Sequence, residues 1–194
     1  MRTFLLASNN QGKLREFREI FNGDNILSLQ DISLKVEVEE DGETFEENAV
    51  KKAREVARIS GMTAISDDSG LCVDALAGAP GVYSARYAGE NASDEDRIRK
   101  LLEELEGEER RSARFVSVVA LCTPQGETVT ARGECEGEIL LQPKGNGGFG
   151  YDPIFYVKEF NKTFGQLTGE EKNSISHRGR AIRALKEKLE DSVE

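Results

Sequence analysis

Residues 3–21 have the sequence TFLLASNNQGKLREFREIF, and this stretch sets the pattern for the chain. Thr3 to Ala7 is a short apolar run of the kind that forms a buried strand. Four apolar residues between Leu14 and Phe21 then recur at helical spacing. The stretch therefore predicts a strand, a loop and a helix, which is the repeating unit of α/β proteins.

The middle of the chain continues this alternation. Thr44 and Glu47 have the spacing of a capping box, in which each side chain accepts from the other residue's backbone amide, and they predict a helix that ends near Gly61. Residues 62–65 predict a short buried strand that ends where the polar run Ser66 to Leu71 begins. We expect this strand to place two aspartates at its end.

The second half predicts both strands and helices. Ser93 and Asp96 start a helix, and residues 114–121 and 127–132 form an antiparallel pair of strands. Further strands are expected at 138–142 and 154–157, and a last helix carries Ile182, Leu185 and Leu189. Since no linker or repeat interrupts the series, we expect one domain, residues 1–194, with a mixed sheet flanked by helices. A cleft between two lobes fits this pattern.

Composition excludes several classes of protein. The formal net charge is −10, which opposes nonspecific binding to nucleic acids and to anionic membranes. No apolar run is long enough to cross a bilayer, and the chain enters its first strand directly, so we expect a cytoplasmic protein. The three cysteines have no CxxC spacing, which predicts neither a disulfide framework nor a zinc site.

Ser8 to Lys13 joins a strand to a helix and has the ingredients of a phosphate site. The turn combines small polar side chains, a glycine, the exposed amides of a helix start and a lysine. It lacks the GxxxxGK[ST] pattern of a Walker loop. A capped surface turn has the same composition, so these residues leave both interpretations open.

Carboxylates gather in two places. Asp67 and Asp68 follow the predicted strand at 62–65, and an acidic run, residues 37–41, precedes the helix at Thr44. Clusters rich in carboxylate oxygens suit Mg²⁺ bound together with a triphosphate. The alternative is a solvated acidic loop, which such runs commonly form.

Two further segments carry chemical groups. Residues 145–153 surround Phe149 with glycines, which predicts either stacking on a flat ligand or a turn that holds a core phenylalanine. His177 is the only histidine and stands near a helix start. One histidine cannot build a multi-histidine metal centre, and the absence of a GxSxG elbow disfavours a Ser/His/Asp triad.

Six ordered motifs resemble the noncanonical purine nucleoside triphosphate pyrophosphatase family, also called the inosine triphosphate pyrophosphatase family. The resemblance covers essentially the whole chain. The six motifs lie at Ser8–Lys13, Glu43–Ala49, Asp67–Leu71, Ala79–Arg86, Gly147–Phe155 and Ser176–Gly179.

The resemblance implies an elongated α/β fold with a long mixed sheet, two lobes with a central substrate cleft, and a homodimer. It implies Mg²⁺-dependent hydrolysis of ITP, dITP or XTP to the monophosphate and pyrophosphate. By position it assigns phosphate binding to Ser8, Asn9, Asn10, Gln11, Gly12 and Lys13, Mg²⁺ binding to Glu40 and Asp68, and a substrate contact to Ser69. Proton acceptance falls to Asp68, and the nucleoside pocket to Phe149, Gly150, Tyr151, Asp152, Lys172, His177 and Arg178.

The first motif departs from the family, which often has Thr-Gly-Asn or Thr-Asn where this chain has Ser8-Asn9-Asn10. Glu39 is an alternative to Glu40 as the metal ligand. Base selection requires a donor at O6 of the purine, for which we expect Arg178, because arginine only donates hydrogen bonds. The alternatives to the whole assignment are a related pyrophosphatase of the Maf type acting on dTTP or UTP, a nucleotide sensor without catalysis, and an acidic interaction domain.

Overall fold

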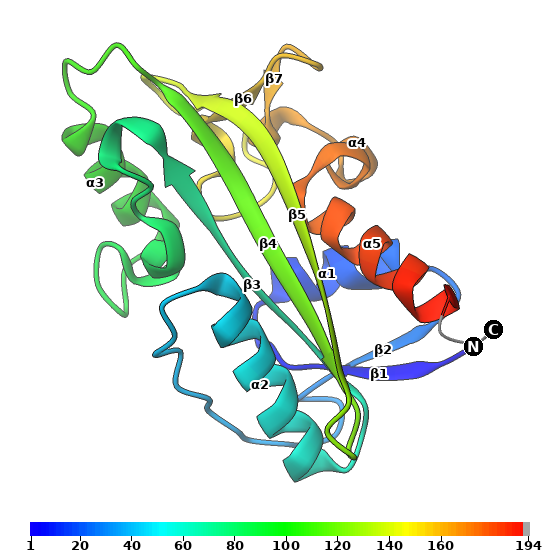
Figure 1. Ribbon diagram of the computed structural model, residues 1–194. Helices are drawn as coiled ribbons and strands as arrows, with labels where there is room; N and C mark the ends of the chain where they lie inside the picture. Colours follow the sequence, from blue (N-terminus) through cyan, green and yellow to red (C-terminus); the bar gives the residue numbers. More distant parts are fainter. Residues whose placement is uncertain (192–194) are drawn as a thin grey trace. The chain divides into compact units, whose positions relative to one another are not determined.

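The computed structural model describes residues 1–191, and its α-helices and strands alternate as far as residue 122 (Figure 1). The strands are β1 (Thr3–Leu6), β2 (Asn25–Ser28), β3 (Ala64–Val73), β4 (Ser112–Cys122), β5 (Thr128–Ile139), β6 (Phe155–Val157) and β7 (Lys162–Thr163). The α-helices are α1 (Gln11–Ile20), α2 (Phe45–Ser60), α3 (Asp94–Glu104), α4 (Gly169–Ile175) and α5 (His177–Asp191). Short 3-10 helices cover Asp74–Leu76, Gly81–Arg86, Asp152–Ile154 and Phe164–Gln166.

The strands form one mixed sheet in the order β2-β1-β3-β4-β5-β6-β7. Strand β1 is parallel to both β2 and β3, whereas β6 is antiparallel to β5 and β7. The turn between β4 and β5 is closed by a hydrogen bond from the Thr123 amide to the Glu127 carbonyl, and a connection this short joins antiparallel neighbours. The predicted class, a mixed α/β sheet flanked by helices, is confirmed.

The chain divides into two compact units. The first contains Met1–Asp68, Ser117–Gly133 and the chain from His177, and the second contains Ser69–Val116 and Glu134–Ser176. Each unit has its own hydrophobic core. The prediction of a single domain over residues 1–194 stays a prediction.

In the first unit, helices α1 and α5 pack together beside the parallel strands (Figure 1). Phe17 and Phe21 of the α1 segment are fully buried with their rings stacked 6.0 Å apart. Gly133, at the end of this unit's part of β5, permits a close approach of α5. A Cβ there would lie 2.2 Å from the carbonyl oxygen of His177 and 2.5 Å from the amide of Ala181. The missing side chain therefore fixes where α5 begins.

In the second unit, three phenylalanines form the centre of the core. Phe115 of β4 is stacked on Phe164 with ring centroids 5.6 Å apart, and both rings pack against Phe155 of β6. Leu101 and Leu105 at the end of α3 are fully buried in the same cluster. The unit thus holds the loop between β5 and β6 against a rigid aromatic base.

The sequence predicts the long helices well. Helix α1 matches the predicted periodicity, α2 ends at Gly61 in a left-handed conformation, and α3 starts at Ser93 with the predicted capping box. The reciprocal capping box at Thr44 is wrong in one half. Thr44 accepts from the Glu47 amide, but the Glu47 carboxylate accepts from the amide of Glu43 instead of Thr44.

The extents of two strands are also corrected. Strand β3 continues from Ala64 to Val73, so the polar run from Ser66 lies within the strand and not after it. The strand continues because its buried polar side chains find partners on other elements, described below. The separate strand predicted at 138–142 is wrong, because β5 runs without interruption to Ile139. The strands β2 and β7 and the helix α4 are not predicted, although Thr168 and Glu171 have the capping-box spacing that starts α4.

The structure also describes the three cysteines and the lengths of the helices, two features on which the composition bears. Cys122 and Cys135 are buried and Cys72 is partly exposed, and all three are free thiols. Among the helices of residues 1–191, not one combines the length and the apolar composition that crossing a bilayer takes.

Candidate active site

Strand β3 carries two adjacent buried aspartates, Asp67 and Asp68. Successive side chains of a strand point to opposite faces of the sheet, so the two carboxylates meet different partners. Asp67 Oδ2 lies 2.7 Å from Lys13 Nζ and accepts from Arg178 Nη2 at 3.2 Å. Asp67 Oδ1 accepts from the hydroxyl of Ser117 at 2.5 Å. Asp67 is therefore an anchor for α1 and α5.

The charges around Asp67 form a buried network. Arg178, in the first turn of α5, is 2% exposed, and its Nη1 donates to Glu16 of α1 at 2.5 Å. Burial alone would raise the pKa of Asp67, but Arg178 and Lys13 hold that pKa well below its usual value. Burial lowers the pKa of Lys13, and Asp67 opposes this effect. Asp67 thus stays ionised and does not serve as a proton acceptor near neutral pH.

Asp68 faces the other side, toward helix α2. Its Oδ1 lies 4.0 Å from Lys52 Nζ, and Lys52 also donates to Glu40 Oε1 at 2.6 Å and to the backbone carbonyl of Asp67 at 2.8 Å. Asp68 Oδ2 is buried and has no hydrogen-bond partner within residues 1–191. Burial raises the pKa of Asp68 to about 6, against the attraction of Lys52 and Lys13. A buried carboxylate oxygen without a partner is suited to take a proton or a cation.

The pair Asp68 and Glu40 fits a magnesium ion of the kind that proteins share with a phosphate ligand. Within residues 1–191 no group of three or more histidine, cysteine or carboxylate side chains is placed to hold a metal alone. Mg²⁺ is commonly bound through one or two carboxylates and substrate phosphates, so a two-carboxylate site suffices. Glu40 belongs to this cluster through Lys52, whereas Glu39 is exposed.

The balance of charge in the cluster supports the same fit. Three cations face four carboxylates, and these side chains are Lys13, Lys52, Arg178, Glu16, Glu40, Asp67 and Asp68. The first unit therefore holds one negative charge in excess at this place. A divalent cation would reverse the sign and prepare the cluster for a polyanion.

The predicted phosphate turn lies at the start of α1 in the same unit. Asn10 caps the helix, since its side chain accepts from the Lys13 amide at 3.0 Å, and the Asn10 amide donates to the Ser8 hydroxyl at 3.1 Å. Asn9 and Gln11 are exposed, while Gly12 and Ser8 are half-buried. The first amides of a helix precede its internal hydrogen bonds, so those of Gln11 and Gly12 are oriented to bind an anion.

The second unit has a buried ion pair of its own. Lys172 of α4 donates to Asp152 Oδ2 at 2.7 Å, and the Lys172 ammonium lies 4.7 Å from the ring centroid of Phe149. The Phe149 amide also donates to Asp152 Oδ2, at 3.0 Å. Gly148 is required here, because a Cβ on it would lie 2.0 Å from the same oxygen. The half-buried Phe149 ring is thus fixed by its own loop and by a lysine.

The remaining predicted residues fall in both units. Tyr151 is buried in the second unit and Ser69 is half-buried at its start. The Gly150 amide donates to Asp94 at 2.9 Å. His177 is buried at the start of α5 in the first unit, beside Arg178. The structure gathers Lys13, Glu40, Asp68 and Arg178 within the first unit, and Phe149, Asp152 and Lys172 within the second.

Three members of the cluster are missed by the sequence analysis. Lys52 lies four residues after Asn48 on the buried face of α2, and a lysine at a core-facing helical position was the available signal. Glu16 is a buried carboxylate on α1, next to the core residue Phe17. Ser117 lies within the continuous apolar run of β4, where nothing local marks it.

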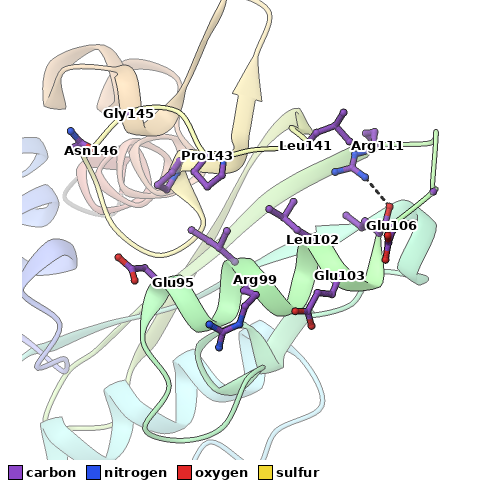
Figure 2. A pocket seen from close by; sticks show the side chains of 14 residues that line it. Glu95, Arg99, Leu102, Glu103, Glu106, Arg111, Leu141, Pro143, Gly145 and Asn146 are labelled. Carbon is purple, nitrogen blue, oxygen red and sulfur yellow. Dashed lines mark hydrogen bonds between the residues drawn. The ribbon is translucent and has the colours of Figure 1, made fainter.

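A hollow of about 970 Å³ lies elsewhere in the second unit (Figure 2). It is bounded by helix α3 on one side and by the segment with Leu141, Pro143, Gly145 and Asn146 on the other. Among the described residues that line it, none carries a predicted role in binding or catalysis. Its charged residues are Glu95, Arg99 and Glu103 of α3, and Glu106 and Arg111, which follow that helix.

The mixed sheet defines an α/β protein, and the cluster around β3 has the side-chain types that a metal ion and a polyanionic ligand require. The chain belongs to the Ham1 family, whose model matches residues 4–188. A relative from Geobacter sulfurreducens, named dITP/XTP pyrophosphatase, is 54% identical over 193 residues and covers 97% of each chain. A Clostridium perfringens protein of the same name is 49% identical over 199 residues, with 97% of this chain and 98% of that one covered.

Solved structures of the family agree with this membership. A HAM1 protein from Coxiella burnetii has a TM-score of 0.88 and 44% identity, and the match covers 98% of this chain and 100% of that one. The Staphylococcus aureus Ham1 protein has a TM-score of 0.87 and 47% identity, with 98% and 99% covered.

Proposed function

We propose that this chain hydrolyses noncanonical purine nucleoside triphosphates, namely dITP, XTP and ITP, to the monophosphate and pyrophosphate, and that it requires Mg²⁺. Relatives that match nearly the full chain at about half identity bear the name dITP/XTP pyrophosphatase. The observation that carries the proposal is the buried Asp68, whose Oδ2 has no hydrogen-bond partner within residues 1–191 while lysines and Glu40 surround it.

Asp68 acts as the general base in the proposed reaction. It accepts a proton from the water that attacks the α-phosphorus, and a covalent intermediate is not needed. Asp67 is unsuited to this task, because it is bound by Lys13, Arg178 and Ser117. When bound by Glu40 and Asp68, Mg²⁺ would neutralise charge on the phosphate oxygens.

Cationic side chains stabilise the leaving pyrophosphate. Lys13 stands at the start of α1 beside the amides of Gln11 and Gly12, so a phosphate bound there meets both an ammonium group and a helix start. Lys52 keeps Glu40 and Asp68 close to each other without binding Asp68 tightly, at 4.0 Å. Lys13 thus places positive charge where the reaction releases negative charge.

The second unit supplies the aromatic surface on which the base stacks in the proposed reaction. Phe149 offers a partly exposed aromatic face for stacking, and its backbone is fixed by Asp152. Selection of 6-keto purines over adenine requires a donor at O6, a role we assign to Arg178. We further propose that the protein acts in the cytoplasm as a homodimer, which a measurement of mass in solution would test.

One assay tests the proposal. Pyrophosphate release is measured from ITP, dITP, XTP, GTP, ATP, dTTP and UTP, with Mg²⁺ or with EDTA. We expect kcat/KM for ITP, dITP and XTP to exceed that for ATP by at least about 10²-fold, and EDTA to abolish turnover. Preference for dTTP or UTP would favour the Maf-type alternative. Binding of nucleotide without release of pyrophosphate would favour a sensor, and either result would overturn the proposal.

A further inference from the structure

The motif Ala79–Arg86 has no role in the proposed reaction, yet its serine forms hydrogen bonds to two other segments of the second unit. Ser84 is 5% exposed, and its hydroxyl accepts from the Leu71 amide at 2.9 Å while donating to the Gly81 carbonyl at 2.6 Å. Leu71 lies two residues after Ser69 on strand β3. The hydroxyl therefore fixes the motif to the strand segment that begins with Ser69.

The same residue also holds the loop that carries Phe149. Tyr151 is 4% exposed, and its hydroxyl donates to the backbone carbonyl of Ser84 at 2.7 Å. Two residues before it stands Phe149, and the next residue, Asp152, accepts from the Phe149 amide. Ser84 is thus bonded on its side chain to β3 and on its backbone to the middle of the Phe149–Asp152 loop.

Further bonds stiffen both ends of this connection. The Val73 amide donates to the Ala79 carbonyl at 3.1 Å, and Cys72 forms an isolated bridge with Pro80, so the motif runs back along β3. On the loop side, the Gly150 amide donates to Asp94 at 2.9 Å. A displacement of Ser84 would therefore be transmitted to the loop through the buried hydroxyl of Tyr151.

We infer that Ser84 and Tyr151 form a positioning latch that sets the distance between Ser69 and the ring of Phe149, and thereby the affinity for the nucleoside part of the substrate. The inference rests on the proposed function, because it takes Phe149 as the surface on which the base stacks. Tyr151 is then a positioning residue, since its hydroxyl bonds to protein and its ring is buried. The latch contributes to binding and leaves the chemical step at Asp68 unchanged.

The test uses substitutions that remove single hydroxyl groups. Tyr151→Phe deletes the bond to the Ser84 carbonyl, and Ser84→Ala deletes the bonds to Leu71 and Gly81. Tyr156→Phe is the matched control, because Tyr156 also donates its hydroxyl within the second unit, to Asn161, but lies outside the latch. For each protein, kcat and KM for ITP are measured, together with inhibition by IMP and by inorganic tripolyphosphate.

Loss of one buried hydrogen bond predicts a specific result. For Tyr151→Phe we expect KM for ITP and the inhibition constant of IMP to rise about 5- to 10-fold, with kcat and inhibition by tripolyphosphate within about twofold of wild type. Ser84→Ala should show the same pattern, and Tyr156→Phe should show no change. Unchanged KM in Tyr151→Phe, or an equal loss for IMP and tripolyphosphate, would overturn the latch.

Hydrogen–deuterium exchange separates this inference from the proposed function. We expect the amides of residues 148–152 to exchange faster in Tyr151→Phe and Ser84→Ala, with no change in Tyr156→Phe. Equal exchange in all four proteins overturns the latch whether or not the wild type is an enzyme. A wild type that releases no pyrophosphate overturns the proposed function, and the exchange then decides the latch alone.

Discussion

The two units each contain a lysine paired with a buried aspartate at the same separation, yet the pairs have different surroundings. Lys13 and Asp67 in the first unit, like Lys172 and Asp152 in the second, stand 2.7 Å apart. Around Asp67 there are further charges, including Arg178. Around Lys172 there are two aromatic rings, at 4.7 and 5.6 Å from its ammonium. We expect the charged surroundings of Asp67 to suit phosphate groups, and the aromatic surroundings of Lys172 to suit a flat base.

The largest expected effect comes from removing a charge from the network around Asp67. Arg178→Ala leaves Glu16 and Asp67 buried without their shared cation, so we expect the free energy of unfolding to fall by about 3–5 kcal/mol. Urea unfolding followed by circular dichroism measures this loss. The exposed Arg180 on the same helix provides the control, and Arg180→Ala should change stability by less than about 0.5 kcal/mol. Equal stability of the two variants would contradict the network.

Arg178→Ala also sharpens the assignment of base recognition. If Arg178 donates to O6 of the purine, the ratio of kcat/KM for ITP and ATP must fall in the variant. If its task is to anchor Asp67, activity falls for both substrates and the ratio stays constant. The bonds to Glu16 and Asp67 show the anchoring task in the structure, and the base-reading task stays a prediction.

Asp68→Asn tests whether chemistry belongs to the first unit alone. Losing the general base and one metal ligand should lower kcat by about 10²-fold or more. The folded protein should not be weakened. Because the pKa of Asp68 is raised to about 6, ionising it lowers the free energy of unfolding as pH rises from about 4 to 6.

The variant Asp68→Asn has no carboxyl group to ionise, so it does not lose this free energy of unfolding as the pH rises. In EDTA at pH 7 we expect Asp68→Asn to be more stable than wild type by about 1–3 kcal/mol, and the difference to vanish below about pH 4. Unfolding midpoints at both pH values provide the measurement. If Asp68→Asn turned over substrate at the wild-type rate at saturating Mg²⁺, this role for Asp68 would be contradicted. A variant less stable than wild type at pH 7 would contradict it as well.

The smallest expected effect probes the recognition side. Phe149→Ala removes the half-buried ring above Lys172, and we expect KM for ITP to rise about tenfold with kcat within about threefold of wild type. The ITP/ATP ratio should stay constant, because stacking does not read hydrogen-bond polarity. Steady-state kinetics with both nucleotides tests this. A fall in kcat larger than the rise in KM would remove the division of tasks between the two units.

Local patterns predicted what local forces determine. The helices α1, α2, α3 and α5 follow from apolar periodicity and caps. Local composition pointed to the turn at Lys13 and to two carboxylate runs, whereas only the family resemblance assigned Lys13, Glu40 and Asp68 to one site. The extent of β3 could not be predicted, because Asp67 is stable in a strand only with partners from distant segments. Arg178 and Glu16, which bond to each other, are 162 positions apart in the chain. No spacing rule relates such residues.

Lys52 was predictable in one respect, its burial, and unpredictable in another, its partners. Its position on the buried face of α2 was visible in the helical spacing, but its partners, Glu40 and the backbone of Asp67, come from other segments. A sequence can thus show that a buried charge needs a partner without showing which residue supplies it.

The charged cluster around Asp67 depends on Gly133, although this glycine takes no part in the ion pairs. The residue has no charge and no side chain, yet the space it leaves is filled by the backbone at the start of α5, the helix that carries Arg178 toward Asp67. A methyl group at Gly133 would displace that helix, and the guanidinium with it. In a saturation mutagenesis of this chain, Gly133 should tolerate as few replacements as the charged residues of the cluster do. Chains that keep those charged residues should also keep a glycine at this position.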